Sequence, residues 1–499
     1  MQQKRISAAI ALLAMTATGT QAIAADALTI YSSAQPGAVS PEQYRSGSGT
    51  PVPGYAVVRH ERDMALIAGR NNVRFSDVAR EIDPTTVSFE SVTDPDGTRV
   101  VEQNYQFDLV SADRLLEKYI DREITVEQQR GNSTQTFIGT LSSTAGGLIL
   151  RNKDGSVQIV NSHSGVKLPE LPGGLITKPT LVWDIAAQKA ATHKTRVAYQ
   201  TGGITWWADY NFTYAEGKDQ SCKLDVGAWV SILNQSGATY KDAKLKLIAG
   251  DVQRAARGRA VPAPEMRVLA KAMDAPAGFE EKTFFEYHLY TLGFPTTLPD
   301  NSTKQLELFP SARNVTCQKA LVYLGQGTGY RPYGGLITDR GYGVQGNTKV
   351  DVYLNFKNSK ENRMGMPLPA GRIRVSKLDT ADNSLEFIGE DVIGHTARDE
   401  SVLIKLGSAF DVVGERKQLD FRINNNARWM EEDIEIKLRN RKEEPVTVLA
   451  RENLYRWANW KIIRQSQEYE KQDSRTIQFP VRIAKGGEST VRYTVRYTW

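Results

Sequence analysis

The last nine residues of the chain, 491–499, read VRYTVRYTW. Every second position is apolar or aromatic, and the positions between them carry only arginine and threonine. Successive side chains of a strand point to opposite faces, so this alternation predicts a β-strand with one face on a core. Such two-faced strands are typical of antiparallel sheets packed as a sandwich. We expect the inward face to be formed by Val491, Tyr493, Val495, Tyr497 and Trp499.

Strand patterning of this kind extends back along most of the chain. Helical periodicity is nearly absent from 196–499, and we expect this region to be a large antiparallel β-sandwich in which a long loop covers 255–278. Upstream, apolar runs punctuated by Gly, Asn and Asp turns over 55–109 predict a small N-terminal β domain. The fold class predicted from these patterns is all-β.

Residues 110–168 differ from their surroundings because they begin with a short helix. Ser111 is a suitable helix cap, and one helical face would carry Leu115, Leu116 and Tyr119. Four or five short strands are predicted after the helix. This combination is typical of a small Sm-like or SH3-like barrel.

Two segments rich in turn-forming residues separate the predicted domains. Gly, Ser and Pro dominate 25–54, which we expect to be a flexible lead-in with at most one strand. The run LPELPGG at 168–174 predicts a linker over 169–195.

The first 24 residues have the features of a cleavable secretory signal. Lys4 and Arg5 precede an apolar stretch too short to span a bilayer, and Ala22-Ile23-Ala24 forms an A-x-A cleavage site. We therefore expect residues 1–24 to be removed and the mature protein to be periplasmic or secreted. No membrane span is expected after removal of the signal.

Composition excludes several classes of protein. The chain has 499 residues, which suggests about three domains. Its 63 Lys and Arg against 57 Asp and Glu give a net charge of +6 without a strongly basic block, so a dedicated nucleic-acid binder is not expected. The mean hydropathy of −0.42 excludes a polytopic helical membrane protein.

Export changes the interpretation of the two cysteines. In an oxidising compartment an even number of cysteines usually indicates a disulfide, so we expect Cys222 and Cys317 to be bridged. Two buried free thiols are the alternative, because spacing alone does not fix the geometry of a bridge.

Candidate catalytic residues are few. The best constellation is Glu390, Asp391 and His395, with Asp399 close behind, because two carboxylates and an imidazole can serve as acid and base or as metal ligands. A polar loop whose side chains satisfy turn backbone groups is the simpler interpretation. The five histidines show no H-x-H or H-x-x-x-H spacing, and no G-x-S-x-G elbow occurs. No cofactor or metal is therefore predicted.

Paired tryptophans offer a binding alternative. Trp206 with Trp207, and Trp457 with Trp460, could form platforms on which sugar rings stack. Adjacent strand residues point to opposite faces, so at least one of Trp206 and Trp207 is expected in the core. Core packing is the favoured interpretation for both pairs.

Several motifs of 196–499 resemble an exported family called domain of unknown function 4139. They are YQTGGITWWADY (199–210), NQSG (234–237), AKL (243–245), AGD (249–251), PLPAG (367–371), GED (389–391), HT (395–396), LGSAFDV (406–412) and the final strand ending in Trp499. Ala397 departs from the family, because proline commonly follows its His-Thr pair. The resemblance implies no catalytic residues, and some members are labelled mucoidy inhibitor-like, which implies a role at the cell envelope.

Two functions follow as expectations. The first is a non-enzymatic envelope protein that binds or organises other envelope components through its β surfaces. The second is a protein that binds or degrades envelope polysaccharide, with Glu390, Asp391 and His395 as its candidate residues. The second requires these side chains to converge in one concave pocket beside an exposed tryptophan.

Overall fold

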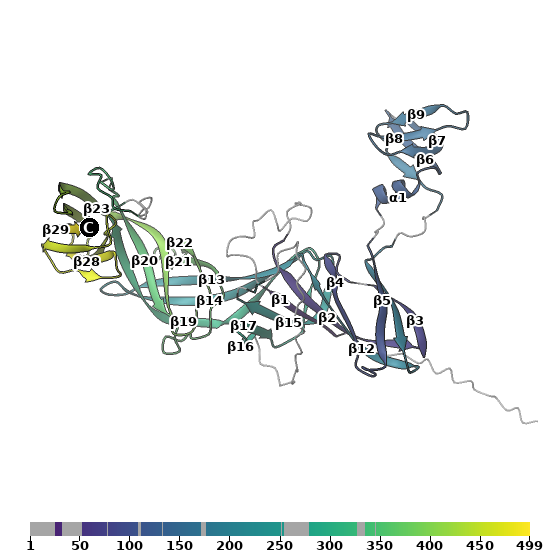
Figure 1. Cartoon of the computed structure of the whole chain (residues 1–499), viewed down its shortest axis with the longest axis horizontal. Helices are drawn as coiled ribbons and strands as arrows, with labels where there is room; N and C mark the ends of the chain where they lie inside the picture. Colours follow the sequence, from purple (N-terminus) through teal and green to yellow (C-terminus); the bar gives the residue numbers. More distant parts are fainter. Residues whose placement is uncertain are drawn as a thin grey trace, which may run out of the picture. The chain divides into compact units, whose positions relative to one another are not determined.

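The computed structural model confirms the all-β prediction (Figure 1). Residues 112–118 form the one helix among the residues that the structure describes. The predicted signal peptide, the 255–278 loop and most of the predicted lead-in lie outside the described residues. The description covers residues 25–31, 52–76, 78–107, 111–131, 133–170, 176–250, 252–253, 279–326, 335–344 and 346–499.

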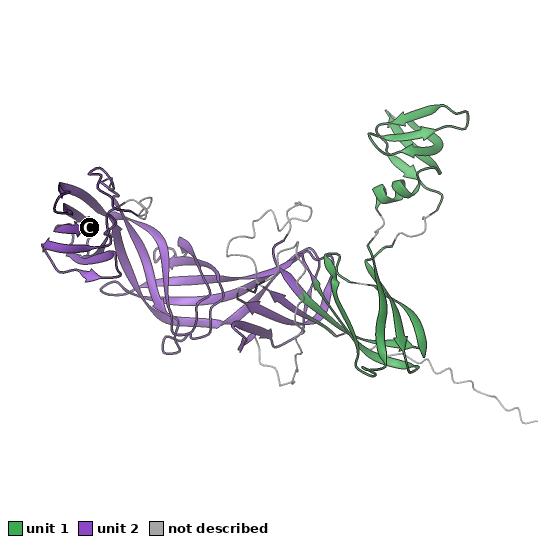
Figure 2. Cartoon of the chain, in the orientation of Figure 1, with its two compact units in different colours: residues 1–27, 57–200 green, residues 28–56, 201–499 purple. Residues whose placement is uncertain are grey.

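The chain forms two compact units (Figure 2). Unit 1 contains residues 1–27 and 57–200, and unit 2 contains residues 28–56 and 201–499. Within the described ranges, no helix has the length and apolar character needed to cross a membrane.

Apart from residues 111–167, unit 1 contains two groups of strands. A three-stranded sheet has the order β3-β11-β5, and β2, β12 and β4 lie side by side in that order. Phe75 and Trp183 are buried with their ring centroids 5.2 Å apart, so aromatic packing anchors the sheet. The strands are β2 (Tyr55–Leu66), β3 (Gly69–Ser76), β4 (Ile82–Ser91), β5 (Thr98–Gln106), β11 (Thr180–Ala187) and β12 (Ala191–Thr201).

The predicted linker over 169–195 is wrong for most of its length. β11 (Thr180–Ala187) is the central strand of its sheet and pairs with both β3 and β5. Leu181, Trp183 and Ile185 are fully buried, because every second residue of TLVWDIAA faces the core. Only the proline- and glycine-rich start of the region predicts a linker, and residues 171–175 lie outside the described residues.

Residues 111–167 form the predicted helix and short strands. Ser111 caps α1 (Ala112–Lys118) by accepting a hydrogen bond from the Arg114 backbone N–H. Tyr119 and the inward residues of the sheet form a separate small core. The Sm-like or SH3-like closure stays a prediction. The sheet has the order β10-β6-β7-β8-β9, with β6 (Glu123–Arg130), β7 (Ser133–Ser143), β8 (Leu148–Arg151), β9 (Val157–Val160) and β10 (Gly165–Lys167).

Unit 2 holds the β-sandwich region. One group of strands has the order β16-β17-β15-β1, with β18 also paired to β15. A thirteen-stranded sheet follows the order β22-β21-β13-β14-β19-β20-β23-β24-β29-β26, from which β25, β28 and β27 branch. The first group contains β1 (Ala25–Tyr31), β15 (Tyr240–Ala249), β16 (Phe279–Phe284), β17 (Tyr287–Leu292) and β18 (Thr296–Leu298).

The large sheet places the C-terminal strand where its alternation predicts. Val491, Tyr493, Val495 and Tyr497 of β29 are all buried in one apolar core. Trp499 packs against the same core and is partly exposed. The strands are β13 (Ile204–Glu216), β14 (Ser221–Asn234), β19 (Ser302–Leu324), β20 (Lys349–Lys357), β21 (Gly371–Leu378), β22 (Leu385–Ile393), β23 (Ser401–Asn424), β24 (Trp429–Asn440), β25 (Val446–Asn453), β26 (Trp460–Gln465), β27 (Glu470–Lys471), β28 (Thr476–Ile483) and β29 (Glu488–Thr498).

The predicted disulfide is present. Cys222 of β14 and Cys317 of β19 lie directly opposite each other on neighbouring strands, with their Cα atoms 4.8 Å apart. The bridge closes a loop of 95 residues. The structure therefore has the bridge and not the alternative of two free thiols.

Candidate functional site

The structure does not bring the predicted catalytic residues together. Glu390 and Asp391 are neighbours on β22, so their side chains point to opposite faces of the sheet. Glu390 is exposed beside Arg374, with 3.7 Å between its Oε2 and the arginine Nε. Asp391 instead accepts hydrogen bonds from the backbone N–H groups of Val392 at 2.8 Å and Lys405 at 2.7 Å. The Asp391 carboxylate thereby fastens β22 to β23.

His395 lies beyond the end of β22 and also serves the backbone. Its Nδ1 accepts a hydrogen bond from the Ala370 N–H at 3.0 Å, and the next residue, Thr396, forms a bridge with Leu368. Asp399 is exposed and takes a positive φ of 66° in a turn. Across the described part of the chain, no three His, Cys, Asp or Glu residues gather as a metal would require.

Only one of the two predicted tryptophan pairs has side chains that are partly exposed to solvent. Trp206 and Trp207 are both buried, so neither can stack a sugar ring without unfolding its strand. Trp457 and Trp460 are partly exposed and pack against the core of unit 2. The Trp460 indole N–H donates to the Ser474 carbonyl at 2.9 Å.

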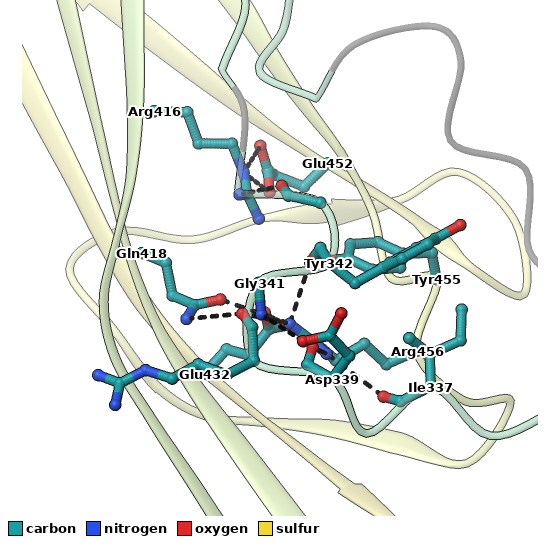
Figure 3. Close-up of polar contacts among 12 residues, drawn as sticks. Ile337, Asp339, Gly341, Tyr342, Arg416, Gln418, Glu432, Glu452, Tyr455 and Arg456 are labelled. Carbon is teal, nitrogen blue, oxygen red and sulfur yellow. Dashed lines mark hydrogen bonds and ion pairs between the residues drawn. The ribbon is translucent and has the colours of Figure 1, made fainter.

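The most concentrated polar chemistry of unit 2 was missed by sequence reasoning. Two arginines and two glutamates, which we call the buried ion cluster, lie inside the sandwich (Figure 3). Arg416 Nε contacts the Glu452 carboxylate at 3.1 and 2.9 Å. Arg456 Nε lies 2.8 Å from Glu432 Oε1 and forms an ion pair with it. All four side chains are at most 2% exposed.

Strand parity places these charges inside. Glu432 shares its face of β24 with Ile434, Ile436 and Leu438, all of which are buried. Glu452 follows Val448 and Ala450 on the inward face of β25. In both strands a glutamate occupies a position that the alternation assigns to an apolar, inward-facing residue. This feature of the sequence could have predicted the buried ion cluster.

Arg456 also holds the segment 335–344 in place. Its guanidinium donates to the carbonyls of Asp339 at 2.6 Å, Tyr342 at 3.1 Å and Ile337 at 3.3 Å (Figure 3). The Tyr455 hydroxyl donates to the same Tyr342 carbonyl at 2.8 Å. These carbonyls belong to a segment without regular strands, so the arginine supplies hydrogen bonds that a sheet would otherwise provide.

The electrostatics of the cluster are those of a closed interior. Burial raises the pKa of Glu432, and the positive charges of Arg456 and Arg416 act in the opposite direction. The Tyr493 hydroxyl donates to Glu452 Oε2 at 2.5 Å, and burial raises the pKa of Tyr493 well above its ordinary value. With its charges facing each other and nothing open to water, the cluster can stabilise the sandwich but cannot meet a substrate.

A second polar site is open to solvent. A pocket of about 190 Å³ lies among β13, β19, β20, β22 and β23. Its walls are formed by Tyr214, Glu216, Lys319, Val352, Leu354, Ile388, Leu406, Gly407 and Ser408. At its edge Glu216 joins two lysines, with Oε1 2.5 Å from Lys319 Nζ and Oε2 3.1 Å from Lys377 Nζ.

The Glu216 ion pairs predict a specific acid sensitivity. Hydrogen bonding to Lys319, and then to Lys377, lowers the pKa of Glu216 from 4.5 to about 2. A carboxylate with a depressed folded pKa stabilises the fold above its unfolded pKa and loses this contribution as the pH falls from about 4.5 towards 2. Urea unfolding of Glu216→Gln should therefore show a shallower loss of stability over this range, by about 1 kcal/mol after allowance for solvent exposure.

The matched control for this experiment is Glu390→Gln, an exposed glutamate with only a 3.7 Å contact to Arg374. It should follow the wild-type profile closely. An unchanged acid profile in Glu216→Gln contradicts the assignment of this stability to the lysine pairs.

Comparison with known proteins adds no relative. No family model, no curated protein and no solved structure matches the chain. The resemblance of 196–499 to domain of unknown function 4139 therefore rests on its motifs alone and stays a prediction.

Proposed function

We propose that the protein is a non-enzymatic component of the cell envelope that binds or organises another envelope protein through its β surfaces. The observation that carries this proposal is that the polar side chains of the candidate sites form hydrogen bonds and ion pairs within the fold. Asp391 and His395 accept hydrogen bonds from backbone N–H groups, and the buried ion cluster is sealed inside the sandwich. These groups support the fold and are not arranged around a common substrate position.

Exposed apolar side chains on a strand surface support the binding role. Leu378 of β21 lies directly opposite Leu385 of β22, and Phe387 follows on the same face of β22. They are 42%, 59% and 60% exposed, and β22 ends the strand order of the large sheet. We call Leu378, Leu385 and Phe387 the β22 patch. Grouped, exposed apolar residues are typical of protein interaction sites.

The disulfide supports the proposed location. A bridge between Cys222 and Cys317 persists in oxidising compartments and is rare in the cytosol. Together with the signal sequence predicted at 1–24, it favours a periplasmic or secreted protein. Membership of the family called domain of unknown function 4139 is part of the same proposal and is supported by the motifs of 196–499.

Polysaccharide binding or degradation is the second candidate. Trp457 and Trp460 keep part of their surface exposed, and Glu390 is exposed on β22. The dispersal of Glu390, Asp391 and His395 over two faces and a loop argues against their joint use as an acid and base pair.

Crosslinking in the native envelope tests the proposal. The tagged mature protein is crosslinked in intact cells and purified under denaturing conditions, and the adducts are identified by mass spectrometry. We expect one reproducible protein adduct at near-stoichiometric yield. Recovery of glycan in place of protein, or of the protein alone, contradicts the proposed role.

A further inference from the structure

The five-stranded sheet of residues 123–167 has an edge strand with unused backbone groups. β9 ends the strand order, and β8 is its only partner among the described residues. In the hairpin between β8 and β9, the Asn152 N–H donates to the Ser156 carbonyl at 2.8 Å. Hydrogen-bonded and non-hydrogen-bonded pairs alternate in an antiparallel ladder, so Val157 and Ile159 occupy non-hydrogen-bonded positions. Their N–H and C=O groups therefore point away from β8, towards the open edge.

The side chains of the same two residues are exposed on the outer face of the sheet. Val157 is 64% and Ile159 is 61% exposed, and Ile159 lies directly opposite the partly buried Ile149 of β8. The sequence of β9, VQIV, contains no charge and no proline, and its register with β8 has no bulge. Charges, prolines and bulges commonly protect edge strands from pairing with other chains. The β9 edge is therefore suited to accept a further strand.

An arginine on this outer face favours an acidic partner. Arg151 of β8 is exposed and lies between Val157 of β9 and Thr140 of β7. No described residue forms an ion pair or a hydrogen bond with its side chain. The Glu123 carboxylate of β6 instead contacts Lys153, with 3.6 Å between Oε2 and Nζ. On a strand added to β9, the residue opposite Val157 would lie about 9.5 Å from Arg151, which an arginine and a glutamate side chain together can span.

We propose that β9 binds an extended segment of another protein by strand addition, and that this segment carries an acidic side chain facing Arg151. The free N–H and C=O groups of Val157 and Ile159 pair with the added strand, whose apolar side chains cover Ile149 and Ile159. A second copy of the chain does not fit as well. An antiparallel β9–β9 pair centred on Gln158 would place an isoleucine opposite Val157, so Arg151 would gain no carboxylate. The proposal adds a second binding surface to the proposed function and shares no residue with the β22 patch.

Two peptides test the charge of the partner. The full mature chain is titrated by calorimetry with acetyl-TITETIT-amide and with acetyl-TITKTIT-amide, in which a lysine replaces the glutamate. We expect saturable binding of the glutamate peptide and about fivefold weaker binding of the lysine peptide, because an attraction to Arg151 becomes a repulsion. Equal affinities, or no saturable binding of the glutamate peptide, overturn the proposal.

Amide hydrogen exchange followed by NMR tests the mode of binding. In the free protein the Gln158 amide should exchange slowly, because it bonds to β8, and the Val157 and Ile159 amides should exchange fast. Binding of the glutamate peptide should slow the exchange of Val157 and Ile159. Unchanged exchange at both amides contradicts strand addition.

Matched arginine variants separate this surface from general effects on the sheet. Arg151→Gln should bind the two peptides equally. Arg130→Gln changes an exposed arginine of β6, three strands from β9, and should keep the preference for the glutamate peptide. If Arg151→Gln keeps this preference as well, the assignment of the acidic contact to Arg151 is wrong.

The state of the free chain tests the alternative occupant. Light scattering should show no dimer that is lost when Val157→Ser is combined with Ile159→Ser. Such a dimer would place a second copy on the edge and overturn the proposal. These measurements use no envelope partner, so their failure is distinguishable from a failure of the proposed role of the β22 patch.

Discussion

Arg456→Met is expected to lower the unfolding free energy of unit 2 by about 3–5 kcal/mol. Glu432 would keep a buried carboxylate without its partner, since the Arg456 guanidinium is the group 2.8 Å away. The carbonyls of Asp339 and Tyr342 would each lose one of two donors and would keep only the Tyr342 N–H and the Tyr455 hydroxyl, respectively. Urea unfolding monitored by tryptophan fluorescence measures the loss.

Two further variants test whether the loss comes from the unpaired buried charge. Arg492→Met removes an arginine that is 67% exposed and paired with Glu435, and it should cost less than about 1 kcal/mol. Arg456→Met combined with Glu432→Leu removes both charges and should recover part of the stability, because no buried ion is left unpaired. If Arg456→Met is as stable as Arg492→Met, the buried ion cluster does not stabilise the sandwich.

Removal of the disulfide should have a comparable effect. Replacing Cys222 and Cys317 by alanine opens a 95-residue loop in the unfolded chain, which in the chain-entropy model costs about 4–5 kcal/mol. Chemical denaturation of the double variant measures the change. Dithiothreitol should destabilise the wild type by a similar amount and leave the alanine variant unaffected.

The outcome that contradicts this prediction is equally clear. If the alanine variant and the wild type unfold at the same denaturant concentration, the bridge between β14 and β19 contributes nothing to stability. The hydrogen-bonded register of the two strands would then be sufficient to hold them together.

Local patterns were enough to predict many strands. The bounds of β2 (Tyr55–Leu66), β8 (Leu148–Arg151) and β9 (Val157–Val160) agree with their apolar runs, because turn residues mark both ends. The inward face of β29 follows from alternation alone. Period-two patterning is a property of single strands and is therefore visible without knowledge of their partners.

Long-range arrangement could not be predicted in the same way. β11 was predicted as part of a linker because a proline- and glycine-rich run precedes it, although buried and partly buried residues alternate clearly along the strand. The pairing of Arg456 with Glu432 joins a residue of the segment after β25 to a residue of β24 that is 24 positions away in the sequence. The pocket is formed by residues of five strands. Such long-range contacts depend on strand order and register, which a single sequence does not specify.

Envelope crosslinking of two matched sets of variants tests the central claim most directly. One set, Glu390→Gln with Asp391→Asn and His395→Gln, changes the predicted catalytic residues. The other, Leu385→Ser with Phe387→Ser, changes the β22 patch, and Phe285→Ser, exposed on the β16–β17 turn, is its control.

A role in protein binding through β surfaces predicts that the protein adduct persists in the first set and in Phe285→Ser. It should be lost when the β22 patch is changed. An adduct that survives the loss of the patch but disappears with Glu390, Asp391 and His395 would contradict this role.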